Sequence, residues 1–157
     1  MVTVSIDVQR ASGQDNEPSD DQIQRWVRAA LAAAQNPSAS LTVRFVDEAE
    51  MSALNMQFRG RHGPTNVLSF PFEVPPGLPE AGDEIGDIVV CVPLVQSEAL
   101  SQGKSLEDHF AHLIVHGVLH LHGYDHQEQD TADIMETLET TVLASLNIAD
   151  PYREITA

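Results

Sequence analysis

The sequence predicts an α+β fold in a single domain that spans residues 1–157. The chain has the length of one domain, and a chain of this size buries about 70% of its unfolded surface. Segments with strand and helix periodicity alternate along its first half. In its second half, residues 109–121 are apolar on most sides of a helix, which is typical of a helix buried at the centre of a fold.

The first half begins with a strand, a helix and a second strand. Apolar and polar side chains alternate over residues 2–8, as expected for a half-buried strand. Ser19 is a favourable N-cap for a helix over residues 20–35, and residues 41–46 form the next strand. A strand, a helix and a strand in this order imply a right-handed crossover, with the two strands parallel in one sheet.

Two more strands complete the predicted sheet. Asp47 begins a helix that ends near Phe58, and residues 67–71 form the third strand. An exposed loop rich in proline, glycine and acidic residues follows over residues 73–84, and residues 86–91 form the fourth strand. The prediction is therefore a four-stranded mixed sheet.

About five helices are expected in total, and the helix that carries the histidines is the central one. Pro93 suits the first turn of the helix that comes before this central helix. The last helix covers residues 128–146. Its predicted buried face consists of apolar side chains at helical spacing: Ile134, Leu138, Val142 and Leu146.

Six of the seven histidines lie between residues 109 and 126. His116 and His120 are four residues apart, which places them about 40° apart around a helix and about 6 Å apart along its axis. Two imidazoles in this arrangement can bind one metal ion. Gly123 favours a helix end at this point, so that the chain can return and bring His126 to the same ion.

These three histidines match the H-x-x-x-H-x-x-x-x-x-H spacing of the metzincin zinc proteases. Gly117, however, stands where those proteases have the glutamate that acts as general base. Three neutral imidazoles with an open fourth position still suit a hydrolytic zinc site. The sequence thus predicts a single metallohydrolase domain with one Zn²⁺ per chain, held by His116, His120 and His126.

A second reading of the histidines is that they are polar positions on an ordinary helix, or core residues with satisfied hydrogen bonds. The glycine break and the correctly spaced third histidine favour the metal site. His112 cannot join it, because it would lie about 12 Å from His120 along the helix axis. We expect that His109, His112 and His122 are not ligands.

The stretch H-G-V-L-H-L-H-G-Y-D-H over residues 116–126 closely resembles the signature of the YbeY family, bacterial metal-dependent endoribonucleases of ribosomal RNA maturation. Two further blocks are similar to the family: L-N-M-Q-F-R-G-R-H-G-P-T-N-V-L-S-F-P over residues 54–71 and I-G-D-I-V-V over residues 85–90. The similarity covers nearly the whole chain. It implies a single-strand-specific endoribonuclease in ribosomal RNA processing, including maturation of the 16S rRNA 3′ end, and in ribosome quality control.

The resemblance also implies partners and site residues. The partners would be single-stranded rRNA, the small ribosomal subunit and its assembly factors. Arg59 matches the family's functional arginine, and its guanidinium can hold the scissile phosphate through two parallel hydrogen bonds. Arg61 is a second candidate for substrate binding, and His116 would take part in catalysis through the metal. Apart from the resemblance, Asp87 or Asp125 could supply a general base, although Asp87 could equally be a structural residue at a strand start and Asp125 a turn residue or one that orients a ligand histidine.

Two alternative functions remain open from the sequence. One is a zinc metalloprotease-like hydrolase, which the missing glutamate after His116 argues against. The other is a ribosome assembly factor whose metal is only structural. A fourth protein ligand would favour a structural metal, whereas an ordered water on the metal would favour catalysis.

Composition sets limits on partners and location. Eight Lys and Arg stand against 24 Asp and Glu, so RNA binding requires a local basic strip, for which Arg59, Arg61 and His62 are candidates. No apolar run approaches the roughly 20 residues that span a bilayer. Residues 1–8 lack the features of a signal peptide, so we expect a cytoplasmic protein. Cys91 is the only cysteine, which excludes an internal disulfide.

Overall fold

The computed structural model describes residues 3–74, 76–77, 82–124 and 129–152. In this part of the chain, four strands form one mixed sheet and five helices pack on it, which confirms the predicted α+β class. The elements follow in the order β1 (Thr3–Arg10), α1 (Asp20–Ala33), β2 (Ser38–Val46), α2 (Glu48–Arg59), β3 (Val67–Pro71), β4 (Glu84–Cys91), α3 (Val92–Gln102), α4 (Leu106–Leu121) and α5 (Gln129–Ser145).

The sheet has the strand order β1-β2-β4-β3, with β1, β2 and β4 parallel and β3 antiparallel at one edge. The parallel pairing of β1 and β2 is as predicted from their connection. One row of neighbouring residues crosses all four strands: Val8, Val43, Ile88 and Ser69. Val43 and Ile88 are buried in the core, and the row ends at the β3 edge with the polar side chain of Ser69.

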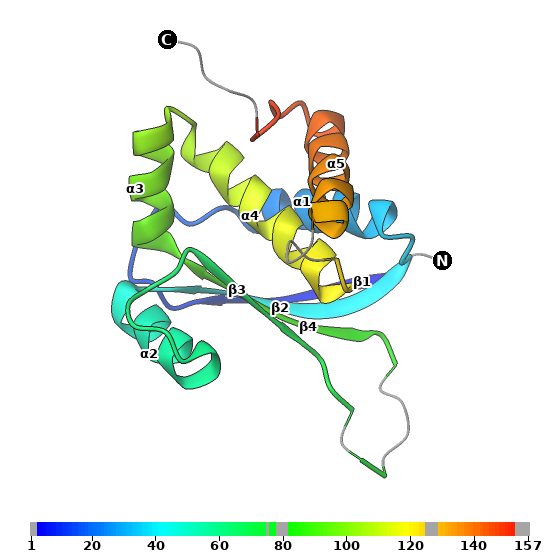
Figure 1. Ribbon diagram of the computed structural model, residues 1–157, viewed down its shortest axis with the longest axis horizontal. Helices are drawn as coiled ribbons and strands as arrows, with labels where there is room; N and C mark the ends of the chain where they lie inside the picture. The colour runs from blue at the N-terminus through cyan, green and yellow to red at the C-terminus, as the bar shows by residue number, and fades with distance from the viewer. Residues whose placement is uncertain (1–2, 75, 78–81, 125–128, 153–157) are drawn as a thin grey trace.

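The two faces of the sheet pack against different helices (Figure 1). On one face, α4 lies across the strands with α1 beside it and α5 outside them, over the larger hydrophobic core. α2 covers the other face over a smaller core, which comprises Val46, Met51, Leu68, Val89 and Cys91. Ten of the 16 residues of α4 are buried, which confirms it as the central helix. Among the helices of the described residues, none combines the length and apolar character required to cross a membrane.

Local sequence signals fix the ends of the two helices that carry the site. Asp47 begins α2, because its carboxylate accepts a hydrogen bond at 2.8 Å from the backbone N–H three residues later. Gly60 ends α2 with a left-handed φ of 65°, which glycine adopts without steric cost. Ser105 caps the start of α4, and Gly123 follows its end with a φ of 94°. The last turns of α2 and α4 are therefore held at defined positions beside the sheet.

The buried face of α5 differs from the prediction. The sequence predicts Ile134 in the core, but its side chain is 54% exposed. The fully or nearly fully buried residues of α5 are Met135, Glu139, Val142 and Leu143, so Val142 is buried as predicted. The predicted Leu138 and Leu146 are partly buried and pack against the core. The physical reason for the difference is the carboxylate of Glu139, which is buried because it binds histidines of α4, and an apolar pattern cannot identify such a position.

Candidate functional site

His116 and His120 lie on consecutive turns near the end of α4, with ring centroids 5.9 Å apart. Both side chains line a cleft of about 740 Å³ at the β3 edge of the sheet. This volume is within the range of ligand-binding pockets. Arg59, Arg61 and His62 line the same cleft. The fold therefore brings together two segments that the sequence singled out separately.

The arginine side of the cleft is held by the end of α2. Arg59 is the last residue of this helix, and Gly60 turns the chain away from the helix axis. The buried side-chain amide of Asn55 donates a hydrogen bond at 2.9 Å to the carbonyl oxygen of Gly63. This bond ties the connection between α2 and β3 back to the helix. Arg61 consequently lines the cleft from a fixed stretch of backbone.

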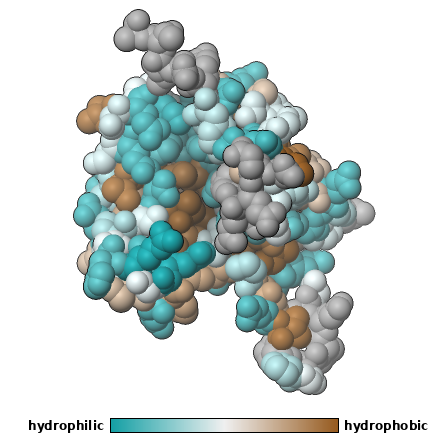
Figure 2. Space-filling view, in the orientation of Figure 1, coloured by the Kyte–Doolittle hydropathy of each residue, from teal (hydrophilic) through white to brown (hydrophobic). Residues whose placement is uncertain are grey.

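The cleft is basic although the chain as a whole is acidic. None of the described residues that line it carries a carboxylate. Arg59 and Arg61 take part in none of the salt bridges among the described residues, whereas Arg10 and Arg44 are paired with acidic side chains. Figure 2 shows strongly hydrophilic side chains gathered near α2 and its connection to β3. These features agree with the predicted local basic strip.

The carboxylate of Glu139 on α5 is fully buried behind His116. Nδ1–H of His116 donates to its Oε1 at 2.6 Å, and Nε2–H of His112 donates to its Oε2 at 3.0 Å. The hydroxyl group of Tyr152 donates to the same Oε2. Burial by itself would raise the pKa of Glu139, but the hydrogen bonds from His112, His116 and Tyr152 outweigh it and lower the pKa to about 2. Glu139 is therefore a buried anion that accepts hydrogen bonds from several donors.

This contact sets the orientation of His116. Because an ionised carboxylate can only accept hydrogen bonds, the proton of a neutral His116 is on Nδ1, and a metal would bind through Nε2. Carboxylate–histidine–zinc arrangements of this kind fix the tautomer and raise the basicity of the ligand. His120 follows on the next turn of α4. The described donors therefore fit a transition metal such as zinc, for which imidazole nitrogens are common ligands.

Two other histidines of the segment make contacts away from the cleft. Nε2 of His109 lies 2.9 Å from a carboxylate oxygen of Glu98. Nδ1 of His122 lies 2.8 Å from the carbonyl oxygen of Val118, and its Nε2 lies 3.0 Å from the side-chain amide of Asn36. Neither histidine lines the cleft. These contacts give both side chains other partners, and their exclusion from the metal site stays a prediction.

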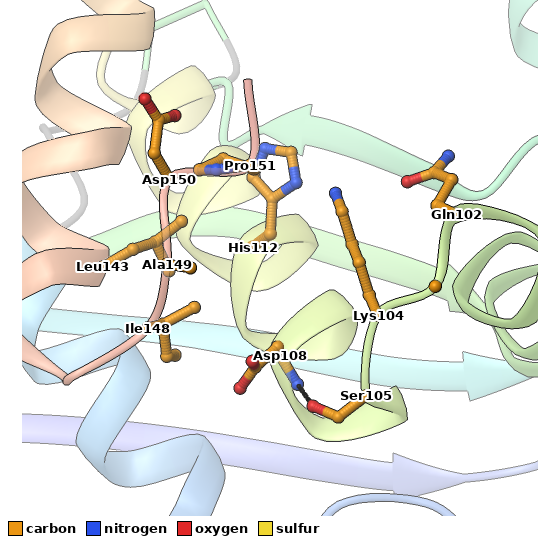
Figure 3. Close-up of a pocket in the computed structure, with 11 residues that line it drawn as sticks. Gln102, Lys104, Ser105, Asp108, His112, Leu143, Ile148, Ala149, Asp150 and Pro151 are labelled. Atoms are coloured by element: carbon orange, nitrogen blue, oxygen red, sulfur yellow. Dashed lines mark hydrogen bonds between the residues drawn. The ribbon is translucent and has the colours of Figure 1, made fainter. Parts of the chain in front are cut away.

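His112 belongs to the wall of a different cavity, shown in Figure 3. This cavity has a volume of about 440 Å³ and lies between the start of α4 and the chain that follows α5. Lys104, Asp108 and Asp150 also line it, so charges of both signs are present. His112 lies between this cavity and the buried Glu139, which agrees with its exclusion from the metal site.

Some of the predicted site residues are not placed in the cleft. His126, the third predicted ligand, and Asp125 lie outside the described residues, and the described residues by themselves contain no group of three metal-binding side chains. Asp87 alternates with Val89 and Cys91 on the sheet face that α2 covers, and it does not line the cleft. A general base is therefore not identified among the described residues of the cleft.

Gly117 packs closely against Ile88 of β4. A Cβ atom there would lie 3.0 Å from two carbon atoms of the Ile88 side chain. The position after His116 thus faces Ile88 of β4 in the core of the sheet and not the cleft, and a larger side chain would require the Ile88 side chain to shift. This packing argues against a base of the protease type at this position.

Sequence reasoning missed Glu139 and Tyr152. One signal for Glu139 was present, since it lies at helical spacing between Met135 and Leu143, in the middle of a buried apolar face. The segment is rich in acidic residues, so this one acid could not be separated from acids on the exposed face. For Tyr152, which reaches Glu139 from the chain beyond α5, the sequence holds no comparable signal.

The sequence and the fold of the chain are both similar to those of known proteins. Residues 7–147 match the model of a family described as endoribonuclease YbeY. A protein of this name from Alkalilimnicola ehrlichii is 58% identical over 137 residues, which cover 87% of this chain and 82% of that protein. Another from Methylococcus capsulatus is 48% identical over 152 residues and 97% of both chains. A solution structure of a Thermotoga maritima protein superposes with a TM-score of 0.56 at 23% identity, covering 94% of this chain and 99% of that one, and supports the fold alone.

Proposed function

Because the chain belongs to the endoribonuclease YbeY family, we propose that it binds and cuts single-stranded ribosomal RNA in the cleft between α2 and α4. The protein is an endoribonuclease, a metal-dependent hydrolase that cuts phosphodiester bonds within an RNA chain. One observation supports this location above all: Arg59, Arg61, His116 and His120 line the same cleft. Groups suited to phosphate and groups suited to a metal are thus adjacent.

In this proposal, His116, His120 and His126 hold one Zn²⁺ per chain. When bound, the ion would supply a Lewis acid that polarises a water, a phosphate oxygen or both. Glu139 is a positioning residue, because it acts on the reaction only through His116. Its full burial and the 2.6 Å contact to Nδ1 support this role, since they hold Nε2 of His116 in one orientation.

Arg59 is the residue that we assign to the scissile phosphate. Its planar guanidinium presents parallel N–H donors that match two phosphate oxygens, and it stabilises the negative charge that develops during the attack. Arg61 would bind a neighbouring phosphate and hold the strand. Both arginines lack a salt-bridge partner within the described part of the chain, so their charge is available to an anionic ligand.

The substrate and partners of this proposal follow from the family resemblance. They are single-stranded ribosomal RNA, with maturation of the 16S rRNA 3′ end and ribosome quality control as the setting, and the small ribosomal subunit with its assembly factors, in the cytoplasm. An open cleft at a sheet edge suits this substrate, since a single strand can bend its backbone toward the arginines and the metal.

Arg59→Lys tests the assignment of the cleft. Lysine keeps the positive charge but loses the two parallel donors, so we expect cleavage of a single-stranded rRNA fragment to fall about 100-fold at unchanged zinc content and melting temperature. Arg25→Lys, on the exposed surface of α1, is the matched control and should retain full activity. His116→Ala should lose zinc and activity together.

Two outcomes would contradict the proposal. Unchanged cleavage by Arg59→Lys, or a loss of cleavage that merely follows a lower melting temperature, would make Arg59 a structural residue at the end of α2. Full retention of zinc by His116→Ala would exclude it as a ligand. Cleavage, metal content and melting temperature should be measured on the same preparations.

A further inference from the structure

We propose that Phe58 is a stacking platform for one nucleobase of the RNA strand in the cleft, an inference that rests on the proposed function. Phe58 lines the cleft beside Arg59, and its side chain is 55% exposed. A phenylalanine exposed to this extent keeps much of its apolar surface in water, and covering that surface would be favourable. Because Phe58 lies beside cationic side chains of the same cleft, a planar, unpaired base is the group that would cover it.

The aromatic ring is already held in place. Phe58 packs against Phe70 of β3 with ring centroids 5.1 Å apart and an angle of 64° between the ring planes, an edge-to-face pair. Phe70 is half-buried and packs against the smaller core with Leu68. The ring of Phe58 is thus fixed by one contact while more than half of the side chain remains accessible. A base can therefore stack on it without first ordering a flexible side chain.

The neighbouring residues provide the charge that such a platform requires. Single-stranded RNA is generally bound by a positive groove along its backbone, combined with aromatic side chains that stack on its bases. Arg59 and Arg61 supply the positive groove, and no described residue of the cleft lining is acidic. Phe58 supplies the aromatic surface within the same short segment.

The platform also has a consequence for the choice of substrate. In a duplex, each base is paired and stacked between its neighbours, so it cannot reach a side chain at the edge of a cleft. An unpaired base can be splayed out onto the ring, and every base offers a face for stacking. Phe58 therefore favours single strands over duplexes without reading the identity of the base.

The experiment measures KM and kcat of the zinc-loaded full chain on a defined single-stranded RNA oligomer. The same measurement is made on a series of oligomers, each of which has one abasic nucleotide at a different position. Wild type should show a position where removal of the base raises KM about tenfold, within the range for one base stacked on an aromatic ring. Phe58→Leu should have this higher KM on the intact oligomer, and the abasic nucleotide should then add nothing.

Two further variants complete the design. Phe58→Tyr keeps the ring and should retain the wild-type KM. Phe72→Leu is the matched control, because Phe72 is also exposed, at 41%, but does not line the cleft, and its KM should be unchanged. Zinc content and melting temperature of Phe58→Leu should equal those of wild type.

The outcomes separate this inference from the proposed function. Stacking on Phe58 is wrong if wild type cleaves the oligomer and Phe58→Leu has the same KM. It is also wrong if the increase in KM caused by Phe58→Leu adds in full to the increase caused by every abasic position. In both cases the cleft assignment stands. If wild type does not cleave single-stranded RNA at all, the proposed function fails and the platform with it.

Discussion

Two carboxylates of this protein bind histidines of the same helix, but the two pairs are buried in opposite ways. Glu98 of α3 binds His109 near the start of α4, and Glu139 of α5 binds His116 near its end. In the first pair the histidine side chain is 4% exposed and the carboxylate 29%. In the second pair the histidine is 20% exposed and the carboxylate 0%. The more exposed member is thus the carboxylate in the first pair and the histidine in the second.

The difference in burial separates a structural contact from a positioning contact. The carboxylate of Glu98 also accepts a hydrogen bond at 3.0 Å from the side-chain amide of Asn66, so this pair ties α3, α4 and the start of β3 together. In the pair of Glu139, the imidazole of His116 is the member that lines the cleft, and the buried anion behind it determines its orientation. A histidine–carboxylate contact thus indicates a functional site when the histidine is the member that faces the ligand.

Glu139→Gln should separate the two pairs most strongly. The amide keeps one acceptor oxygen but directs an NH₂ group either at His116 or at His112 and Tyr152, so the three donors can no longer all be accepted and His116 is held less firmly in one tautomer. We expect zinc affinity to be about 10- to 100-fold weaker, with a corresponding loss of RNA cleavage. Competition with a chelator of known affinity measures the change in zinc binding.

Glu98→Gln is the matched control for zinc binding, because it is the same substitution at the other histidine pair. Its zinc affinity should equal that of wild type. A similar loss of zinc in both variants would mean that general stability, and not the orientation of His116, controls metal binding.

Glu98→Gln should instead have a moderate effect on stability. The carboxylate is partly exposed, so weakening its hydrogen bonds to His109 and Asn66 should lower the free energy of unfolding by about 1 kcal/mol. Glu139→Gln should lower it by more, since its partners are left with a poor acceptor in a fully buried place. Denaturant unfolding of the metal-free proteins measures both values. A larger cost at Glu98 than at Glu139 would contradict this order.

Much of the fold could be predicted because its signals are local. Ser19 forms a capping box with Gln22 at the start of α1, and Asp47 caps α2, and both depend on residues only three positions apart. The alternation that predicted β1 depends likewise on nearest neighbours. The histidine spacing and the arginine of α2 could be identified from short motifs.

The polar contacts of the site could not be predicted, because they depend on packing between distant elements. Glu139 and His116 are 23 residues apart and meet only when α5 packs on α4. Without that contact, an acid in the sequence of α5 indicates an exposed position, and for this reason the predicted buried face of the helix was wrong at Ile134. The contact between Phe58 and Phe70 likewise requires α2 to lie over β3.

The smallest expected effect is a contribution of His109 to stability at acid pH. Burial lowers the pKa of His109 in the folded protein, and the hydrogen bond to Glu98 offsets this only in part. Since the folded pKa is below the unfolded value of about 6.5, the unfolded chain takes up the proton first as the pH falls. Stability should therefore decrease from about pH 6.5 down to the folded pKa, and it should not change through His109 above this range.

His109→Gln isolates this contribution, because glutamine keeps a donor for Glu98 but does not titrate. The free energies of unfolding of the metal-free proteins are measured at about pH 7.5 and about pH 5.5. The decrease between the two pH values should be larger in wild type than in the variant. The difference should stay below the limit of about 1.4 kcal/mol per pH unit for one proton. If the two proteins lose the same stability, His109 does not resist protonation in the fold. Glu98 would then compensate fully for the cost of burying a charged imidazole at His109.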